Sequence, residues 1–586
     1  MSNQRPSLPT LRADLLLLHP PAVFDFRERR DIYFPFLGTS GDVPITPLYE
    51  YFPLGFKTLQ RYLAGHGHEV RIINLSTLLL RFPNIELETL AQSLEVKLVG
   101  VDFHWMVHVQ GSLAVAREMK RLLEGVPILL GGISSTYYAE RLIQYSFVDM
   151  VMRGYDTHGS MALLLDRIKQ GGDLATVPNL LWKSKEGEIH DNGSSLPPDH
   201  FGCGIDWSIQ PRQTGDAEGL PILELISSHN AGCSHNCGWC GGSRQAFGRV
   251  FGSGRTLVRK RLSEIAYEFE TIKRLPGANL YHLYSVGTYN ESRKRLELLI
   301  DRVQESDLRS ISYEQFFLTP DDLLRRMARA NPRTTITLSP QSHDLEISRL
   351  SGRGTYTNRQ LERWLDKAFN YGISAVDLWY FIGMPRQDAR SVKETVDYCA
   401  HLLDRFKGCR VRPLLCPMIP FLDPASTFFE DPGRYGYRLF HRTLEEHRRG
   451  MCRASIINRI NYETRWLSRS DLIFVGFQAV RDLMRSKAEA RILPETIVQG
   501  YNSRIEDALQ FIRLVHEVDC LADAKERERA LDGIGDEILL RNNKVLFSGV
   551  ANQAFPVDRP IGGRWFDETG WEPGLLEAAA GTPAAD

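Results

Sequence analysis

Three cysteines fall within eight residues of the chain, at Cys233, Cys237 and Cys240. The chain has nine cysteines in 586 residues, which is too few for a disulfide scaffold. The Cys-x3-Cys-x2-Cys spacing directly follows a strand that we expect at residues 222–227. Because barrel enzymes hold their reactive groups on loops at the C-terminal ends of strands, we expect the three thiols in an active site.

Three thiolates on one loop suit a [4Fe–4S] cluster with one open iron. Such a cluster has four irons and usually takes four thiolates, so three cysteines leave one iron free to bind a small molecule. The amino and carboxylate groups of S-adenosylmethionine (SAM) suit that iron. An electron from the reduced cluster can then break the sulfonium bond. The product is a 5′-deoxyadenosyl radical, which takes hydrogen from an unactivated carbon.

A structural zinc site is the alternative interpretation of the same cysteines. It would need a fourth ligand, for which His235 or His229 is near in the sequence. Structural zinc sites usually show paired Cys-x2-Cys units, and the sequence has no second pair. The spacing therefore favours the iron–sulfur cluster, while a non-enzymatic zinc-binding protein stays as the weaker alternative.

The cysteine motif, with the aromatic Trp239 before its last cysteine, resembles the signature of the radical SAM superfamily. The resemblance implies a partial βα barrel, a cofactor-binding role for Trp239 and further SAM contacts. By that resemblance, Ser339, Gln341 and Arg353 lie near the ribose and amino-acid part of SAM, although Gln341 stands where the family usually has an acid. Gly383, in a turn similar to the family's Gly-x-Pro, lies by the adenine. Ordinary barrel turns would give the same residues.

The family's Gly-Gly-Glu element after the second barrel strand is not visible here. The segment 285–290 occupies its place, so the backbone of Gly287 or the side chain of Thr288 is expected at the SAM ammonium group. Two further features leave a functional and a structural reading open. Cys416 would face the barrel cavity or be structural, and residues 461–466 would line the substrate site or cap a helix.

Residues 13–195 resemble the cobalamin-binding domain that precedes the barrel in one radical SAM class. Matching stretches occur in the same order at 53–56, 65–70, 99–102, 130–134 and 148–154. The resemblance implies that Gly131, Gly132, Ser134 and Gly154 lie against the corrin or its nucleotide tail, since ligands of doubly wound folds bind at the C-terminal edge of the sheet. The plainer alternative is that these glycines merely end strands.

No cobalt-ligating histidine motif is expected. The segment at Asp102 and His104 looks similar to Asp-x-His-x2-Gly, but it lacks the glycine and follows the third strand rather than the first. We therefore reject His104 as that ligand and expect cobalamin to bind without a histidine below the cobalt, although His104, Trp105 or Met106 remain candidates to face the ring. The first cysteine is Cys203, so the chain does not resemble methylthiotransferases, which ligate a second cluster with three N-terminal cysteines.

The expected organisation is an α/β chain of three parts. Alternating strands and helices predict a doubly wound, Rossmann-like cobalamin-binding domain at 13–195 and a partial (βα)6 TIM-like barrel at 221–430. A linker at 196–220 would join them. A mainly helical region is expected at 431–575, and disordered tails at 1–12 and 576–586.

The composition of the chain argues against some classes of binding partner. Hydrophobic residues make up 43% of the chain, and the formal net charge is −1, so no global field favours nucleic acid or an anionic membrane. No apolar run approaches the ~18 residues of a membrane span. We expect a cytoplasmic protein that takes a small-molecule or lipid substrate and an external electron donor such as flavodoxin or ferredoxin.

The resemblance implies three cofactors: a [4Fe–4S] cluster, SAM and cobalamin. The expected activity is methyl transfer from methylcobalamin to an unactivated carbon, with a second SAM restoring the methyl group. A cobalamin-dependent rearrangement, ring contraction or cyclisation without methyl transfer remains open. No catalytic side chain and no particular substrate follow from the sequence.

Overall fold

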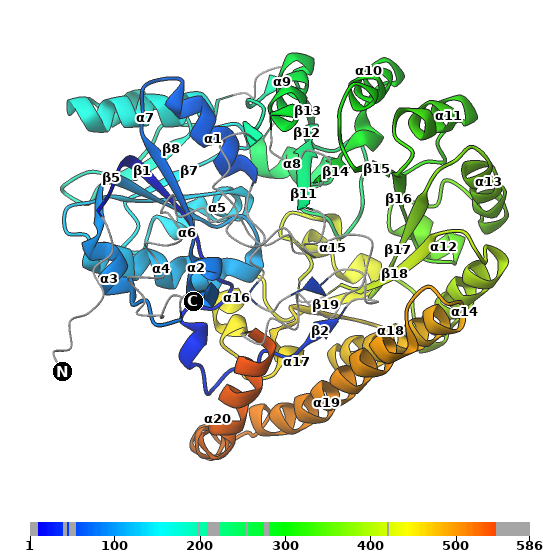
Figure 1. Ribbon diagram of the computed structural model, residues 1–586. Coiled ribbons are helices and arrows are strands. Elements are labelled where there is room, and N and C mark those ends of the chain that lie inside the picture. Colours follow the sequence, from blue (N-terminus) through cyan, green and yellow to red (C-terminus); the bar gives the residue numbers. More distant parts are fainter. Residues whose placement is uncertain are drawn as a thin grey trace, which may run out of the picture.

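The computed structural model describes residues 10–38, 44–45, 48, 54–81, 83–195, 200–207, 223–252, 256–274, 281–418 and 421–546. The predicted C-terminal tail, most of the predicted N-terminal tail and most of the linker lie outside the described residues. Figure 1 shows an α/β domain in blue and cyan beside a half-barrel in green and yellow, with long orange helices along the half-barrel.

The N-terminal domain is built on a seven-stranded sheet of order β4-β1-β5-β6-β7-β8-β9. The first five strands in this order are parallel, and β8 and β9 add an antiparallel hairpin at the edge. The strands are β1 (Leu11–His19), β4 (Val70–Asn74), β5 (Leu94–Asp102), β6 (Ile128–Gly131), β7 (Met150–Met152), β8 (Leu180–Lys183) and β9 (Ile189–Asp191). The helices around this sheet are α1 (Leu54–Ala64), α2 (Leu75–Arg81), α3 (Leu87–Gln92), α4 (Val109–Leu122), α5 (Ile133–Tyr137), α6 (Ala139–Leu142) and α7 (His158–Gln170).

Strand β1 shows why this sheet is covered on both faces. Leu15 and Leu17 belong to one buried apolar cluster, whereas Leu16 and Leu18 belong to another. Because successive side chains of a strand point to opposite faces, each face of the sheet needs its own layer of helices. The predicted doubly wound fold is therefore confirmed, and the sequence 179–191 forms the antiparallel hairpin of β8 and β9 at its edge.

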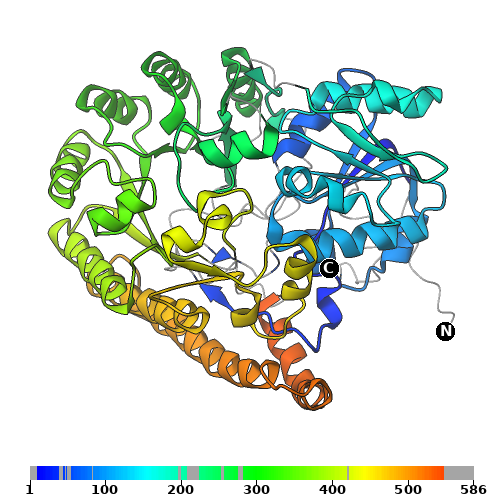
Figure 2. The same cartoon turned by 180° about the vertical axis from the view of Figure 1, so that it is seen from behind.

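The second domain is a six-stranded parallel sheet of order β11-β14-β15-β16-β17-β18. Its strands are β11 (Leu223–Ser228), β14 (Tyr281–Val286), β15 (Ser310–Gln315), β16 (Thr334–Gln341), β17 (Ala375–Ile382) and β18 (Val411–Pro417). The helices between and after them are α8 (Arg244–Phe251), α9 (Leu262–Lys273), α10 (Arg293–Gln304), α11 (Asp321–Ala330), α12 (Leu345–Leu350), α13 (Asn358–Asn370), α14 (Ala389–Arg405) and α15 (Thr427–Glu430). Figure 2 shows the helices in an arc around the outside of the curved sheet. The predicted partial barrel is confirmed.

Side chains alternate across the barrel wall. Ile311 and Tyr313 of β15 belong to the core beneath the helices, so Ser312 and Glu314 point to the inside of the barrel. The same alternation puts Cys416 on the inside, because its neighbour Leu415 lies in the helix-side core. The inside of the barrel is thus partly polar, as a substrate chamber requires.

A small sheet of order β10-β13-β12 had no counterpart in the sequence predictions. It consists of β10 (His200–Phe201), β12 (Asn230–Gly232) and β13 (Leu257–Lys260). Strands of two to four residues carry too little periodicity to be recognised. This sheet links the described part of the linker to the segment that leads into the three cysteines.

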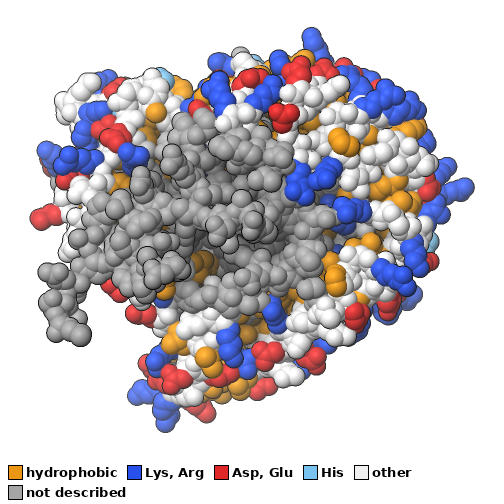
Figure 3. Space-filling model, in the orientation of Figure 1, with side chains coloured by type: hydrophobic (Ala, Val, Ile, Leu, Met, Phe, Trp, Pro, Cys, Tyr) orange, Lys and Arg blue, Asp and Glu red, His pale blue; other side chains and the backbone are white. Residues whose placement is uncertain are grey.

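The C-terminal region is mainly helical, as predicted. It contains α16 (Leu444–Met451), α17 (Ile456–Arg459), α18 (Arg469–Glu489), α19 (Glu495–Asp519) and α20 (Ala524–Leu546), with a short hairpin of β19 (Tyr437–Leu439) and β20 (Tyr462–Thr464). Figures 1 and 2 both show α18 and α19 along one side of the half-barrel. No helix in the described part of the chain is long and apolar enough to cross a bilayer. Figure 3, which has the orientation of Figure 1, shows acidic and basic side chains interspersed over most of the described surface on this side of the molecule.

Candidate active site

The three cysteines lie on the loop between β12 and α8, at the C-terminal end of the barrel. Cys233 and Cys237 are buried and Cys240 is half-buried. The loop ends at Ser243, whose hydroxyl accepts the Ala246 N–H and so starts α8. The position predicted for the motif is thus the one that the structure gives it.

Backbone contacts fix the shape of this loop. Gly232 has φ +74°, and a Cβ there would overlap the Thr256 carbonyl oxygen. A Cβ at Gly238 would overlap the ring of Phe428. Gly238 also donates its N–H to the Ser351 carbonyl (3.2 Å) and accepts the Phe428 N–H (2.8 Å). The loop is therefore clamped between the turn after α12 and the start of α15.

The thiols sit in a desolvated environment. Burial raises the pKa of Cys233 and, more strongly, that of Cys240. The His235 N–H donates to Cys233 Sγ at 3.2 Å. Thiols that resist ionisation on their own need a nearby cation to become thiolates, and iron supplies one. Three cysteines of which two are buried and one is half-buried fit a metal cluster better than a solvent-exposed redox site.

Two side chains next to the thiols were missed by the sequence predictions. The Asn290 side chain accepts hydrogen bonds from the Ser234 N–H and hydroxyl (3.1 and 2.6 Å) and lies 3.8 Å from Cys233 Sγ. The Tyr289 hydroxyl lies 3.9 Å from the same sulfur. Both lie in the segment 285–290, which has no match to the family's Gly-Gly-Glu element, so only the fold shows that they lie beside the cysteines.

The half-buried Asp423 also borders the loop. Its carboxylate accepts the Gly241 N–H at 2.9 Å. Burial raises the pKa of Asp423 to about 6, against the opposing effect of that N–H. Asp423 comes from the segment after β18, far from the motif in sequence, and no local pattern marks it.

Neither histidine of the zinc alternative is directed at the cysteines. His229 is buried, with Nε2 2.8 Å from the Ser285 hydroxyl and Nδ1 3.4 Å from the Glu291 carboxylate. His235 packs against the rings of Tyr289, Phe316 and Phe317. Within the described ranges, no three His, Cys, Asp or Glu side chains converge as a single metal ion requires. A preformed mononuclear zinc site is therefore not among the described residues.

The two residues predicted at the SAM ammonium group, Gly287 and Thr288, already form hydrogen bonds within the protein. The Gly287 N–H donates to the Glu314 carboxylate at 2.8 Å, and the Thr288 hydroxyl donates to the Glu314 carbonyl at 2.5 Å. Gln315 donates to the same hydroxyl at 3.0 Å. The structure thus brings a carboxylate from the third barrel strand to the place where the sequence lacked one after the second.

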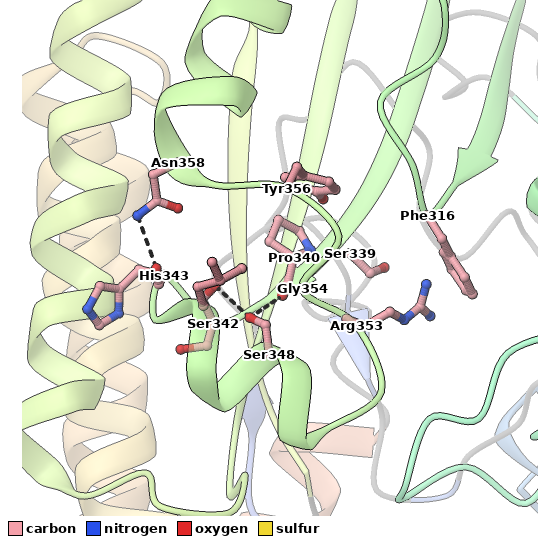
Figure 4. A pocket seen from close by; sticks show the side chains of 11 residues that line it. Phe316, Ser339, Pro340, Ser342, His343, Ser348, Arg353, Gly354, Tyr356 and Asn358 are labelled. Atoms are coloured by element: carbon pink, nitrogen blue, oxygen red, sulfur yellow. Dashed lines mark hydrogen bonds between the residues drawn. The ribbon is translucent and has the colours of Figure 1, made fainter.

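Ser339 and Arg353 line a pocket beyond the end of β16, which holds about 320 Å³ of empty space, open solvent included. Figure 4 shows the Arg353 guanidinium facing the ring of Phe316, and its centre is 2.8 Å from the ring centroid. Arg353 Nε and Nη1 are buried without a hydrogen-bond partner among the described residues. Because buried guanidinium groups are normally paired, this side chain is suited to a carboxylate ligand.

Three other predicted SAM contacts lie in different surroundings. Gln341, with φ +70°, is fully buried opposite Tyr380 after a register shift in β16, and its amide has no partner among the described residues. Gly383 is packed against Tyr462, and its N–H and carbonyl are hydrogen-bonded to Gln387 and Tyr437. Packing alone therefore explains the glycine at 383. Trp239 is half-buried against the Phe381 ring at 5.3 Å.

The four residues predicted to contact cobalamin lie at the C-terminal edge of the N-terminal sheet. Gly131 ends β6, and a Cβ there would meet nothing within 4 Å. A Cβ at Gly132 would overlap the backbone of His104, and the Ser134 hydroxyl donates to the His104 carbonyl at 2.8 Å. Gly154 has φ +110° and follows β7. Gly131 and Gly154 are thus open to a ligand, whereas Gly132 and Ser134 support the loop after β5.

That loop presents aromatic groups at the same edge. Trp105 is 44% exposed, and His104 is exposed beside it. Met106 is buried in the core and is thereby removed as a group that faces the corrin ring. Behind them, buried His19 lies with Nδ1 3.0 Å from the Asp102 carboxylate. A flat ligand at this edge would rest on Trp105 or His104.

The two edges meet at one interface between the domains. Tyr155, which follows Gly154, packs on Phe247 and Phe251 of α8 with ring centroids 4.8 and 5.2 Å apart. Helix α8 begins directly after the cysteine loop. The strand edge that carries Gly154 in the first domain and the helix that follows the cysteine loop in the second are therefore neighbours across this contact.

The segment 461–466 forms hydrogen bonds that hold the chain after β18 in place. Asn461 exchanges hydrogen bonds with the Leu422 backbone (2.9 and 3.1 Å), and the Tyr462 hydroxyl donates to the Met418 carbonyl. Tyr462 belongs to β20 rather than to a helix cap. These contacts favour the structural reading of this segment over substrate binding.

Comparison with known proteins identifies a family for each of the two domains. The B12 binding domain family matches residues 42–164, and the Radical SAM superfamily matches residues 227–399. No curated protein matches the chain. Among solved structures, the radical SAM methyltransferase TsrM from Kitasatospora setae, with cobalamin and a [4Fe–4S] cluster bound, is similar at 16% identity and TM-score 0.49, over 73% of this chain and 77% of that one. The cobalamin-dependent radical enzyme OxsB is similar at 12% identity and TM-score 0.48, over 93% and 84%.

The two matched domains imply three cofactors, and the residues present fit them. The radical SAM domain implies a [4Fe–4S] cluster and SAM, for which the buried thiols and the unpaired Arg353 nitrogens are suited. The B12-binding domain implies cobalamin, for which the open glycine edge is suited. The chain therefore belongs to the radical SAM superfamily, as a cobalamin-dependent radical SAM enzyme whose B12-binding domain precedes its radical SAM domain.

Proposed function

We propose that this enzyme transfers a methyl group to an unactivated carbon of a small-molecule or lipid substrate. The observation that carries the proposal is the contact of Tyr155 with α8, because it brings the open glycine edge of one domain next to the cysteine loop of the other. When bound, the cluster, SAM and cobalamin supply the electron, the radical and the methyl group. The same proposal places the enzyme in the reducing cytosol.

The side chains of the chain have defined tasks in this proposal. Cys233, Cys237 and Cys240 hold the cluster. The charge of Arg353 suits the SAM carboxylate, and Glu314 suits the SAM ammonium group, because the Gly287 N–H and the Thr288 hydroxyl are already used. Such charge-assisted contacts orient SAM before its bond breaks.

The remaining predicted residues act around these groups. Gly131 and Gly154 leave room for the corrin, while Gly132 and Ser134 hold the loop that carries Trp105. In the barrel, Ser339 lines the pocket beside Arg353. Trp239 and Phe381 pack together at the mouth and exclude water from the reacting groups.

The test uses the full chain with its cluster reconstituted without oxygen, cobalamin, a chemical reductant and SAM labelled in its methyl group. We expect 5′-deoxyadenosine, S-adenosylhomocysteine and label in the protein-bound corrinoid. Alanine variants of the three cysteines should lose 5′-deoxyadenosine, and the matched control Cys409→Ala should keep it. Formation of 5′-deoxyadenosine without any labelled corrinoid would favour a rearrangement or ring contraction instead.

A further inference from the structure

One exposed aromatic side chain lies directly beside the cysteine loop. Phe317 follows β15 and is 43% exposed, although large apolar side chains are usually covered. Its ring contacts the His235 ring at a centroid distance of 5.0 Å. Phe317 thus forms the solvent-exposed end of a group of contacting aromatic rings that leads inward.

The innermost residue of this group of rings, His235, contacts one of the three cysteines. The His235 N–H donates to Cys233 Sγ at 3.2 Å. The His235 ring also contacts Phe316 and Tyr289 at 5.2 and 5.8 Å. His235 therefore contacts both the exposed Phe317 ring and the sulfur of Cys233. An electron that enters at Phe317 has a short path to a cluster held by Cys233.

Two exposed arginines lie in segments that contact the cysteine loop at or next to His235. The exposed Arg244 donates its N–H to the His235 carbonyl at 2.8 Å. The exposed Arg349 lies in the last turn of α12, and its carbonyl accepts the N–H of Gly352, which abuts the Asn236 backbone of the cysteine loop. Neither guanidinium has an acidic partner among the described residues, whereas many other surface arginines do, such as Arg293 with Asp322. Their charges are free to attract a partner.

We propose that Phe317, Arg244 and Arg349 form the docking surface for a small acidic electron-transfer protein. The inference rests on the proposed function, since it needs a cluster at the three cysteines. Each encounter moves one electron from the reduced centre of the partner, which is oxidised by one electron, to the cluster, which is reduced by one. No bond forms or breaks at this step. Two exposed cations and one exposed aromatic side chain next to the cysteine loop complement an acidic partner and speed the encounter at low salt.

The experiment measures the rate of cluster reduction by stopped-flow absorbance in the reconstituted full chain. The probe is flavodoxin reduced to its hydroquinone, compared with dithionite. In the double variant Arg244→Glu/Arg349→Glu, we expect the second-order rate with flavodoxin to fall at least about 10-fold at low salt and to lose most of its salt dependence. The dithionite rate should stay within about twofold, as a local charge effect requires.

Two further variants make the result specific. Phe317→Ser should slow flavodoxin without changing the net charge. Arg329→Glu/Arg333→Glu makes the same charge change at exposed positions beside the N-terminal end of β16, away from the loop, and should leave both rates unchanged. Equal flavodoxin rates in wild type and the Arg244→Glu/Arg349→Glu variant would overturn the docking surface alone. A wild-type protein that forms no cluster would overturn both proposals.

Discussion

Glu314 is a carboxylate inside the barrel whose charge no full ion pair balances among the described residues. Burial raises its pKa, while the Gly287 N–H and the charge of Arg353 act in the opposite direction. An ammonium group beside it would favour the ionised form. This makes Glu314 the strongest candidate for the SAM ammonium contact, although no sequence motif marks it.

Glu314→Gln should therefore weaken SAM binding while keeping an acceptor for the Gly287 N–H. A lost charge-assisted hydrogen bond costs about 1.5–3 kcal/mol, so we expect the Kd of SAM to rise roughly 10- to 150-fold. Isothermal titration of the cluster-loaded protein measures this. The control Asp322→Asn removes an exposed carboxylate on α11 and should leave the Kd unchanged. An unchanged Kd in Glu314→Gln would remove Glu314 from the site.

The paramagnetic resonance spectrum of bound cobalamin depends on whether Trp105 or His104 lies beneath the corrin. Trp105 has no nitrogen lone pair to offer cobalt, whereas an imidazole coordinates it readily. With Trp105 beneath the corrin, the paramagnetic resonance spectrum of bound cob(II)alamin should show no nitrogen splitting. Trp105→His should split each cobalt line into three, because one ¹⁴N nucleus becomes a ligand. A threefold splitting in wild type that disappears in His104→Ala would assign the position to His104 instead.

At the scale of elements, apolar runs bounded by turn residues were sufficient to find the strands. The apolar run 375–382 has the bounds of β17, and the runs 69–74 and 411–418 differ from β4 and β18 by one residue at one end. The strand expected at 222–227 corresponds to β11, which ends one residue later. Parallel strands buried on both faces produce this strong signal. The thiols, the glycine edge and Arg353 were likewise within reach of the sequence, because their motifs are local.

Elements shaped by distant contacts were not predictable in the same way. The sequence pattern at 138–144 predicts one helix, which corresponds to α6, but it does not predict α5, which begins at Ile133 and is separated from α6 at Tyr138. The Tyr138 hydroxyl donates to the Arg442 carbonyl at 2.8 Å, a partner 304 residues away. Asp423 and Asn290 were missed for the same reason, since only the folded chain brings them to the cysteine loop.

One buried side chain of helix α20, Asn542, attaches this helix to the segment 29–34. The Asn542 amide accepts the Phe34 N–H at 2.7 Å and donates to the carbonyls of Ile32 and Arg29 at 2.8 and 3.2 Å. The segment that contains these residues has no regular strand or helix of its own at 29–34, so its backbone groups rely on this amide.

Asn542→Ala should consequently destabilise the protein more than its size suggests. Leaving a buried donor or acceptor unpaired costs about 1–3 kcal/mol, and at least two groups would lose their partner. We expect a lower unfolding midpoint in urea and faster proteolysis of α20. The neighbouring Asn543 is exposed, so Asn543→Ala is a matched control that should behave as wild type. Equal midpoints for the two variants would contradict the role assigned to Asn542.

At the scale of the molecule, the two cofactor domains depend on the C-terminal region to stay in contact. Tyr137 donates to the Glu430 carboxylate at 2.8 Å and Tyr138 to the Arg442 carbonyl. Met451 and Leu444 of α16 belong to the core of the N-terminal domain. Since the glycine edge and the cysteine loop come from different domains, any loosening of this joint separates the groups that have to act together.

His447 makes this joint sensitive to acid. It is fully buried on α16, where Nδ1 donates to the Thr443 carbonyl at 2.9 Å and Asn461 donates to Nε2 at 3.2 Å. Burial, with the nearby His441, lowers the pKa of His447 to about 4. An unfolded histidine has a pKa near 6.5, so between pH 6.5 and 4 the unfolded chain binds a proton that the folded chain does not. Stability present above pH 6.5 is therefore lost as the pH falls, by up to about 3 kcal/mol at pH 4.

His447→Gln should flatten this dependence, because an amide does not titrate while it can still accept the hydrogen bond from Asn461. The measurement is the unfolding midpoint in urea at steps from pH 7.5 to 4.5, compared as a slope so that the cost of the substitution itself cancels. His401→Gln on α14 replaces a 53% exposed histidine and should keep the wild-type slope. If the slopes of wild type and His447→Gln ran parallel, the acid sensitivity would have to arise from carboxylates elsewhere, and the joint would not be its origin.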